Sequence, residues 1–220
     1  MSNPKRRLIV GISGASGVIY GVRALQILQA MPDIESHLIL SSAARRTLLE
    51  ETDWTVDAVE AMADVVHNNR DIGASVASGS FQTLGMLVAP CSIKTLSGIA
   101  NCYADNLLTR AADVCLKERR PVVLMVRETP LHLGHIELME KAARYGAIMA
   151  PPVPAFYNRP RSLNEIIDHA VGRVLDLFGI EHRLLKRWKE SDTAVAGQAS
   201  QPTPSQATVS ISKGAAATAD

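Results

Sequence analysis

The glycine- and serine-rich turn at residues 11–17 is the first stretch whose residue types and spacing could bind an anion. Gly11, Gly14 and Gly17 recur at every third position, with Ser13 and Ser16 between them. Glycine allows close approach of a ligand to the backbone, and the N–H groups at the start of a helix favour a phosphate. The sequence therefore predicts an anion-binding turn, the alternative being a tight connection that binds nothing.

The flanking elements narrow the choice of ligand. A short apolar run at residues 8–10 predicts a buried strand before the turn, and apolar residues at helical spacing over 18–31 predict a helix after it. The glycine spacing is not the G-x-G-x-x-G of dinucleotide folds, and Ser41-Ser42 ends the second predicted strand, 37–40, where those folds place a carboxylate. No P-loop lysine follows. A mononucleotide with one phosphate, such as FMN, fits better, with Ser41 meeting it from the second strand.

A second turn of the same kind follows the buried strand predicted over residues 85–89. Cys91 and Ser92 there open a helix that extends to about residue 100. The carboxyl ends of parallel strands share one edge of a sheet, so both turns are expected on the same edge. Cys91 has no His or Asp partner that the sequence identifies, and we expect a small packed thiol instead of a nucleophile.

Charged residues near strand and helix ends are further candidates for functional residues. Arg127 and Glu128 directly follow the buried strand predicted over 122–126, and a charged pair at the ligand edge favours function over a solvated surface. Glu51 lies near the end of a predicted helix, 43–52, where an acid opposes the helix dipole. A functional carboxylate is slightly favoured there. His132 and His135 lie one turn apart without an evident third ligand, so we interpret them as structural or pocket-lining and predict no metal site.

The composition and net charge of the chain limit its possible partners, cellular location and fold class. The 220 residues are 47% hydrophobic with a net charge of +1, which argues against a nucleic-acid partner. Three cysteines without C-x-x-C spacing indicate a reduced, cytoplasmic chain, and neither a signal peptide nor a membrane-spanning run is expected. Alternating strands and helices predict an α/β fold with a mostly parallel sheet. One domain is expected over residues 1–190, followed by a disordered low-complexity tail over 191–220.

Five motifs carry a resemblance to a known family: GISGASGVIYG, the SGS of residues 78–80, PCSIKTLSGIA, RAADVCLKERRPVVLMVRETPLH and PPVPAFYNRP. From about residue 7 to 188 the chain resembles flavin prenyltransferases of the UbiX type, within the flavin-binding Cys-decarboxylase-like flavoproteins. The resemblance implies a Rossmann-like, flavodoxin-like three-layer sandwich and a large homo-oligomer, usually a dodecamer. It implies that dimethylallyl monophosphate prenylates reduced FMN at N5 and C6 without a metal. The prenylated FMN would serve a UbiD-type decarboxylase. The DDxxD motif of metal-dependent prenyltransferases does not occur.

The resemblance also implies roles for single residues. The flavin would be held by Gly14, Ala15, Ser16, Ser41, Cys91, Ser92, Ile93, Lys94 and Arg127. Some family members carry small residues in place of Ile93 and Lys94. The allylic phosphate would be bound by Lys117, Arg127, Tyr157 and Arg173, partly from a neighbouring subunit, with Trp188 closing the site. Glu51 and Ser16 would lie near the reacting flavin nitrogen, and Glu128 would be the acid/base.

Two other functions stay open at this point. The first is an FMN-dependent decarboxylase acting on a peptidyl or pantothenoyl cysteine, on a similar fold. The second is a non-enzymatic flavin carrier.

Overall fold

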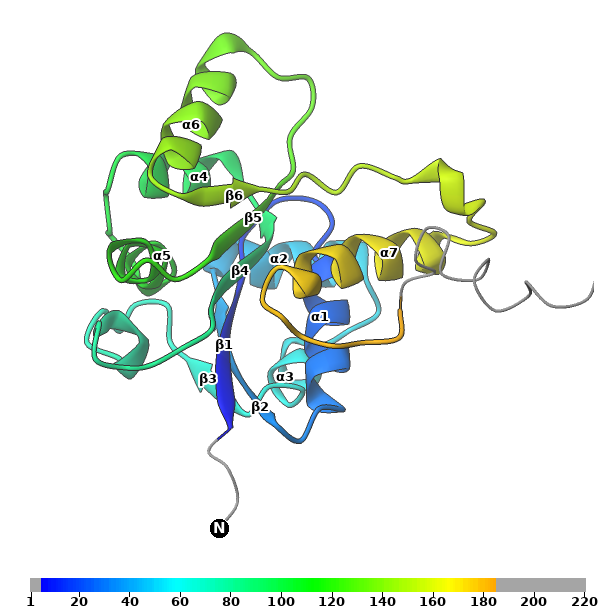
Figure 1. The fold of residues 1–220 in the computed structure, drawn as a ribbon, viewed down its shortest axis with the longest axis horizontal. Coiled ribbons are helices and arrows are strands. Elements are labelled where there is room, and N and C mark those ends of the chain that lie inside the picture. The colour runs from blue at the N-terminus through cyan, green and yellow to red at the C-terminus, as the bar shows by residue number, and fades with distance from the viewer. Residues whose placement is uncertain (1–4, 185–220) are drawn as a thin grey trace, which may run out of the picture. The chain divides into compact units, whose positions relative to one another are not determined.

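The computed structural model describes residues 5–184, which contain one six-stranded sheet (Figure 1). Its strands are β1 (Arg6–Ile12), β2 (Ile34–Leu40), β3 (Val65–His67), β4 (Gly85–Cys91), β5 (Val122–Val126) and β6 (Ala147–Met149). They pair in the order β3-β2-β1-β4-β5-β6, and every pairing is parallel. The predicted α/β fold with a parallel sheet is confirmed, in the strand order of Rossmann folds. Trp188 and the predicted tail, 191–220, lie outside the described residues.

Helices cover both faces of the sheet and make three layers. One face carries α1 (Ile19–Gln29), α2 (Ser42–Glu51), α3 (Val56–Glu60) and α7 (Leu163–Asp176). The other carries α4 (Ile93–Ala100), α5 (Leu107–Lys117) and α6 (Leu133–Arg144). Two short 3₁₀ turns, η1 (Ser75–Ala77) and η2 (Phe156–Asn158), interrupt the connections.

The central strands β1, β2, β4 and β5 are buried on both faces over most of their length, as their continuous apolar runs predict. Along β1, Leu8 and Val10 pack on the side of α1, while Ile9 packs on the side of α4 and α5. The last helix begins as its sequence indicates, because the Ser162 hydroxyl accepts the N–H of Glu165 at 3.2 Å.

The position of the site follows from the point where the strand order reverses. β1 and β4 are neighbours, yet the chain leaves β1 for α1 on one face and leaves β4 for α4 on the other. Their ladder pairing ends at Gly11 and Val88. Beyond it the two connections diverge, and such a divergence at the carboxyl ends of parallel strands opens a ligand crevice.

Candidate active site

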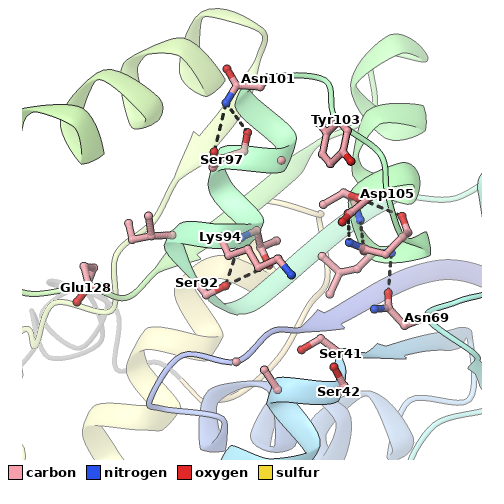
Figure 2. Close-up of a pocket in the computed structure, with 18 residues that line it drawn as sticks. Ser41, Ser42, Asn69, Ser92, Lys94, Ser97, Asn101, Tyr103, Asp105 and Glu128 are labelled. Carbon is pink, nitrogen blue, oxygen red and sulfur yellow. Dashed lines mark hydrogen bonds between the residues drawn. The ribbon is translucent and has the colours of Figure 1, made fainter.

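A cleft of about 800 Å³ opens at this divergence. Figure 2 shows the starts of α2 and α4 facing each other across it, with Ser41 and Ser42 on one side and Ser92 and Lys94 on the other. Its size lies within the range of small-molecule sites. The cleft is lined by Gly14, Ser41, Ser42, Ala43, Asn69, Ser92, Ile93, Lys94, Thr95, Ser97, Gly98, Asn101, Tyr103, Asp105, Asn106, Leu108, Thr109 and Glu128.

Two helix N-termini supply hydrogen-bond donors to this cleft. The Ser41 hydroxyl caps α2 by accepting the N–H of Ala44 at 3.0 Å, and the Ser92 hydroxyl caps α4 by accepting the N–H of Thr95 at 3.3 Å. Lys94 is exposed in the first turn of α4 and forms no ion pair within residues 5–184. A cation at that end of a helix opposes the dipole, so an anion bound between the two helices would relieve an unfavourable interaction. This donor set fits a phosphate monoester.

The glycine turn before α1 already holds an anion from its own chain. The Glu51 carboxylate accepts the N–H of Gly17 at 2.8 Å and that of Val18 at 3.4 Å. An acid at the end of α2 therefore lies at the start of α1, where the dipole favours it. The predicted dipole cost at the end of α2 is offset by this contact, which the sequence does not show because it identifies the helix that carries Glu51 but not the helix that Glu51 contacts.

Arg127 and Glu128 emerge from β5 beside the cleft. The Arg127 N–H donates to the Cys91 carbonyl at 3.1 Å, which ties the two strand ends together. Burial raises the pKa of Tyr20, in the first turn of α1, and the positive charge of Arg127 partly lowers it. Glu128 lines the cleft, with its carboxylate accepting the N–H of Thr129 at 2.9 Å.

The predicted packed thiol and histidine pair are both found. Cys91 is fully buried in the core beneath α4, and burial raises the pKa of its thiol far above the usual range, so it is no nucleophile. The rings of His132 and His135 contact each other at the start of α6, with centroids 3.6 Å apart and their planes tilted by 34°. Among residues 5–184, no three His, Cys, Asp or Glu side chains gather as metal ligands. No helix of the described chain is long and apolar enough to cross a membrane.

Comparison with known proteins decides the family. The Flavoprotein family model matches residues 1–173. Flavin prenyltransferase UbiX of Escherichia coli K12 is 64% identical over 186 residues, which cover 84% of this chain and 98% of that protein. UbiX of Thauera aromatica is 54% identical over 182 residues, covering 83% and 93%. This chain belongs to the UbiX flavin prenyltransferases.

Solved structures agree with this assignment. AnUbiX in complex with FMN and dimethylallyl pyrophosphate is 45% identical, with a TM-score of 0.82 over 84% of this chain and 98% of that one. A dodecameric FMN-dependent UbiX-like decarboxylase from Escherichia coli O157:H7 is 50% identical, with a TM-score of 0.81 over 83% and 99%. The FMN-dependent cysteine decarboxylase TvaF is only 15% identical, with a TM-score of 0.56 over 76% and 98%, and shares the fold alone.

Within one chain of this UbiX family member, only part of the predicted site comes together. The cleft gathers Gly14, Ser41, Ser92, Ile93, Lys94 and Glu128. Ala15 and Ser16 continue the loop from Gly14, half-buried, and Arg127 adjoins Glu128. Cys91 reaches this region with its backbone only, because its side chain is buried in the core.

None of the four residues assigned to the allylic phosphate lines the cleft, and only Arg127 adjoins a residue that does. Lys117 ends α5, a helix that runs back to the start of β5, so it lies toward the opposite edge of the sheet. Its ammonium forms an ion pair with Glu118 and lies against Gly79. Arg173 is on α7, on the other face, and bonds Asp176 at 3.1 Å. Tyr157, in η2, contacts His169 of α7 at 3.2 Å.

Sequence reasoning missed the polar end of the cleft, which Figure 2 shows around Asn69, Tyr103 and Asp105. Asn106 caps α5 by accepting the N–H of Thr109 at 3.1 Å, and Asn69 accepts the N–H of Leu108 at 3.0 Å. An Asn directly before an apolar helical run is a capping signal. It could have located the helix start, but not its position beside the flavin turn.

Proposed function

We propose that this cleft binds reduced FMN and that the protein joins a dimethylallyl group to N5 and C6 of the flavin. The observation that carries the proposal is the 64% identity to a flavin prenyltransferase along 98% of that relative. Bound FMN supplies the nucleophilic ring, and the protein has to hold it, exclude water and place charges. The cysteine-decarboxylase alternative is supported by the shared fold alone.

The FMN phosphate is proposed to lie between the starts of α2 and α4. Both helices direct capped N-termini into the cleft, and Lys94 adds a positive charge without a described ion partner. The start of α1 is a poorer phosphate site, because the Glu51 carboxylate already accepts its N–H groups and would repel a second anion. Ser41, Ser92 and Ile93 would then contact the phosphate end of the flavin.

The flavin ring is proposed to extend from the phosphate toward the end of the cleft where Glu128 lies. The loop of Gly14, Ala15 and Ser16 would lie along it, and Arg127 would contact the ring from β5. Glu128 is the proposed acid/base, since it is the acid that lines the cleft at this end and is exposed. Glu51, held at the start of α1, would face the reacting edge beside Ser16.

The second substrate is proposed to be dimethylallyl monophosphate, bound where subunits meet. Cationic side chains with a tyrosine hydroxyl can stabilise a departing phosphate, which is the set formed by Lys117, Arg127, Arg173 and Tyr157. Because these residues are dispersed within one chain, the proposal requires a neighbouring subunit to bring its Lys117 to the cleft. A dodecamer like that of the Escherichia coli O157:H7 relative would supply such contacts. Trp188 would help to close the site.

The direct test is anaerobic incubation of the protein with reduced FMN and dimethylallyl monophosphate, followed by mass spectrometry of the flavin. We expect a mass increase of one prenyl group, with dimethylallyl pyrophosphate as the comparison donor. An unchanged flavin would reject the function. Glu128→Gln should stop turnover while FMN still binds, and undiminished turnover would favour a flavin carrier.

A complementation experiment tests the shared site. Lys117→Ala and Glu128→Gln are each expected to be inactive, so they are unfolded together and refolded as a one-to-one mixture. If Lys117 acts on a neighbouring cleft, random assembly pairs an intact cleft with an intact lysine in about a quarter of the sites, and about a quarter of wild-type activity returns. A mixture as inactive as its components would place both residues in one subunit's site, and an active Lys117→Ala variant would remove Lys117 from the reaction.

The prenylated FMN is proposed to pass to a UbiD-type decarboxylase. A cytoplasmic location remains a prediction from the cysteine content.

A further inference from the structure

We propose that Ser13 is a positioning residue whose buried hydroxyl sets the width of the flavin cleft. It lies between the two connections that form the cleft walls, although it does not line the cleft itself. This inference rests on the proposed function, because the cleft that Ser13 shapes is the one proposed to hold FMN.

The Ser13 side chain is 1% exposed and uses its hydroxyl in both directions. It donates to the Pro90 carbonyl at 2.8 Å and accepts the N–H of Ser92 at 2.7 Å. Its backbone N–H also donates to the Pro90 carbonyl, at 3.2 Å, and its own carbonyl accepts the N–H of Ala15 at 2.9 Å. One residue therefore connects the turn after β1 to the end of β4 and to the N-cap of α4.

These hydrogen bonds connect the two chain segments beyond the last paired residues of β1 and β4. The β1–β4 ladder stops at Gly11 and Val88, and the two connections then leave toward opposite faces. Past the ladder, the bonds of Ser13 to Pro90 and Ser92 tie the two walls together. Ser92 is the N-cap of α4, so the position of Ser13 sets where the start of that helix lies relative to Gly14.

Loss of the hydroxyl should act on flavin binding in particular. Ser13→Ala leaves the Ser92 N–H without its acceptor beside the core, so the start of α4 shifts toward water or another partner. The phosphate donors on α4 would then no longer match those on α2. The lost interaction corresponds to an FMN dissociation constant raised about tenfold. Ser13 touches no reacting atom in this arrangement, so turnover at saturating FMN should change by less than about twofold.

Ser36 offers a matched control. It is likewise fully buried, and its hydroxyl donates to the Asp64 carboxylate at 3.0 Å and accepts the Asp64 N–H at 3.1 Å. It lies near the start of β2, paired with Leu8 of β1, away from the cleft. Ser13→Ala and Ser36→Ala therefore each remove one doubly bonded buried hydroxyl, and only the first should affect the flavin.

The experiment measures FMN dissociation constants by fluorescence titration, KM for reduced FMN, kcat, and melting of the FMN-free protein. We expect Ser13→Ala to raise the dissociation constant and KM about tenfold with kcat retained, and Ser36→Ala to lower the melting temperature with FMN affinity retained. Equal FMN affinity in Ser13→Ala and wild type, or an equal loss in both variants, overturns the inference. Failure of the wild-type protein to bind FMN would instead reject the proposed function.

A second pair of variants decides the case if Ser13→Ala does not fold. Ser13→Thr keeps the hydroxyl, and Ser13→Cys keeps nearly the same shape with a much weaker hydrogen-bonding group. We expect FMN affinity near wild type for Thr and reduced severalfold for Cys. Wild-type affinity in Ser13→Cys would show that packing, and not the hydrogen bonds, holds the two walls.

Discussion

Replacing Glu51 by alanine should destabilise the start of α1. The carboxylate accepts two backbone N–H groups there, at 2.8 Å from Gly17 and 3.4 Å from Val18. Loss of an N-terminal cap costs about 1 kcal/mol, and loss of a negative charge beside the dipole adds about 0.5 kcal/mol at an exposed position. For a chain of this size, about 1.5 kcal/mol corresponds to a melting temperature lower by about 4 °C.

Glu51→Gln separates the cap from the charge. The Gln side-chain carbonyl can still accept the Gly17 N–H, so about two-thirds of the stability loss should be spared. Catalysis should respond in the opposite way: if the charge beside the flavin is used, Gln loses turnover almost as fully as Ala while FMN still binds. The assays are thermal unfolding of FMN-free protein by circular dichroism and prenylation followed by mass spectrometry.

Glu50→Ala is the control, because Glu50 is the neighbouring acid on the same helix and forms an ion pair with Arg46, at 2.7 Å on the surface. An exposed pair of this kind contributes little to stability, because solvent screens its charges. If Glu51→Ala melts no lower than Glu50→Ala, the capping argument is refuted. If Glu51→Gln prenylates FMN as fast as wild type, Glu51 acts on the fold and not on the reaction.

Three other variants or treatments have expected outcomes. Arg120→Lys should raise KM for the allylic phosphate severalfold and leave FMN affinity unchanged, because Arg120 donates to the Gly79 and Phe81 carbonyls at 2.6 Å each, beside Lys117, and a lysine cannot bridge both. His67→Gln should reduce the loss of unfolding free energy that occurs as the pH falls from 7.5 to 5.5. Denaturant unfolding at each pH measures this free energy. A thiol reagent under native conditions should label Cys102 alone, since the other two cysteines are buried with raised pKa values; mass spectrometry counts the labels.

The sign of the pH effect follows from the direction of the pKa shift. Burial, followed by the charge of His37, lowers the pKa of His67, so the unfolded chain binds that proton more readily. The stability that the neutral His67 contributes to the fold is complete above the unfolded pKa of about 6.5 and is lost as the pH falls. The 2.9 Å contact between the rings also needs an unprotonated nitrogen. The hydrogen bond from His37 lowers the pKa of Glu35, which adds a loss in the same direction at more acidic pH.

Most of the fold could be predicted because its signals are local. Apolar runs bounded by glycine or proline gave β1, β4 and β5, and β4 extends two residues beyond its predicted end, through Pro90 to Cys91. Helix ends differ by one or two residues, as for α1, predicted over 18–31 and found from Ile19 to Gln29. A helix frays into turns at its ends, and residue types alone do not mark that transition.

Only those parts of the site that lie within one continuous segment of the chain could be predicted from the sequence. The expectation that two turns share one sheet edge is confirmed by Gly14 and Ser92, which line one cleft. The partner of Glu51 could not be predicted, because Gly17 lies 34 residues away and the contact depends on how α2 packs beside α1. The role of Ser13 was hidden for the same reason: a serine among glycines gives no sign that its hydroxyl is bonded to another turn.

If Lys117 binds the allylic phosphate as proposed, the topology implies that one chain does not complete this reaction. In a parallel sheet the helices run opposite to the strands, so a residue such as Lys117 at the end of a helix lies at the edge opposite the cleft. Side-chain motion cannot bring it back across a buried sheet whose strands rise about 3.3 Å per residue. If Lys117 binds substrate phosphate, it must therefore do so for another subunit, and active-site occupancy should depend on assembly. Dilution that separates the subunits should then remove prenylation before it removes FMN binding, because the FMN donors of α2 and α4 lie within one chain.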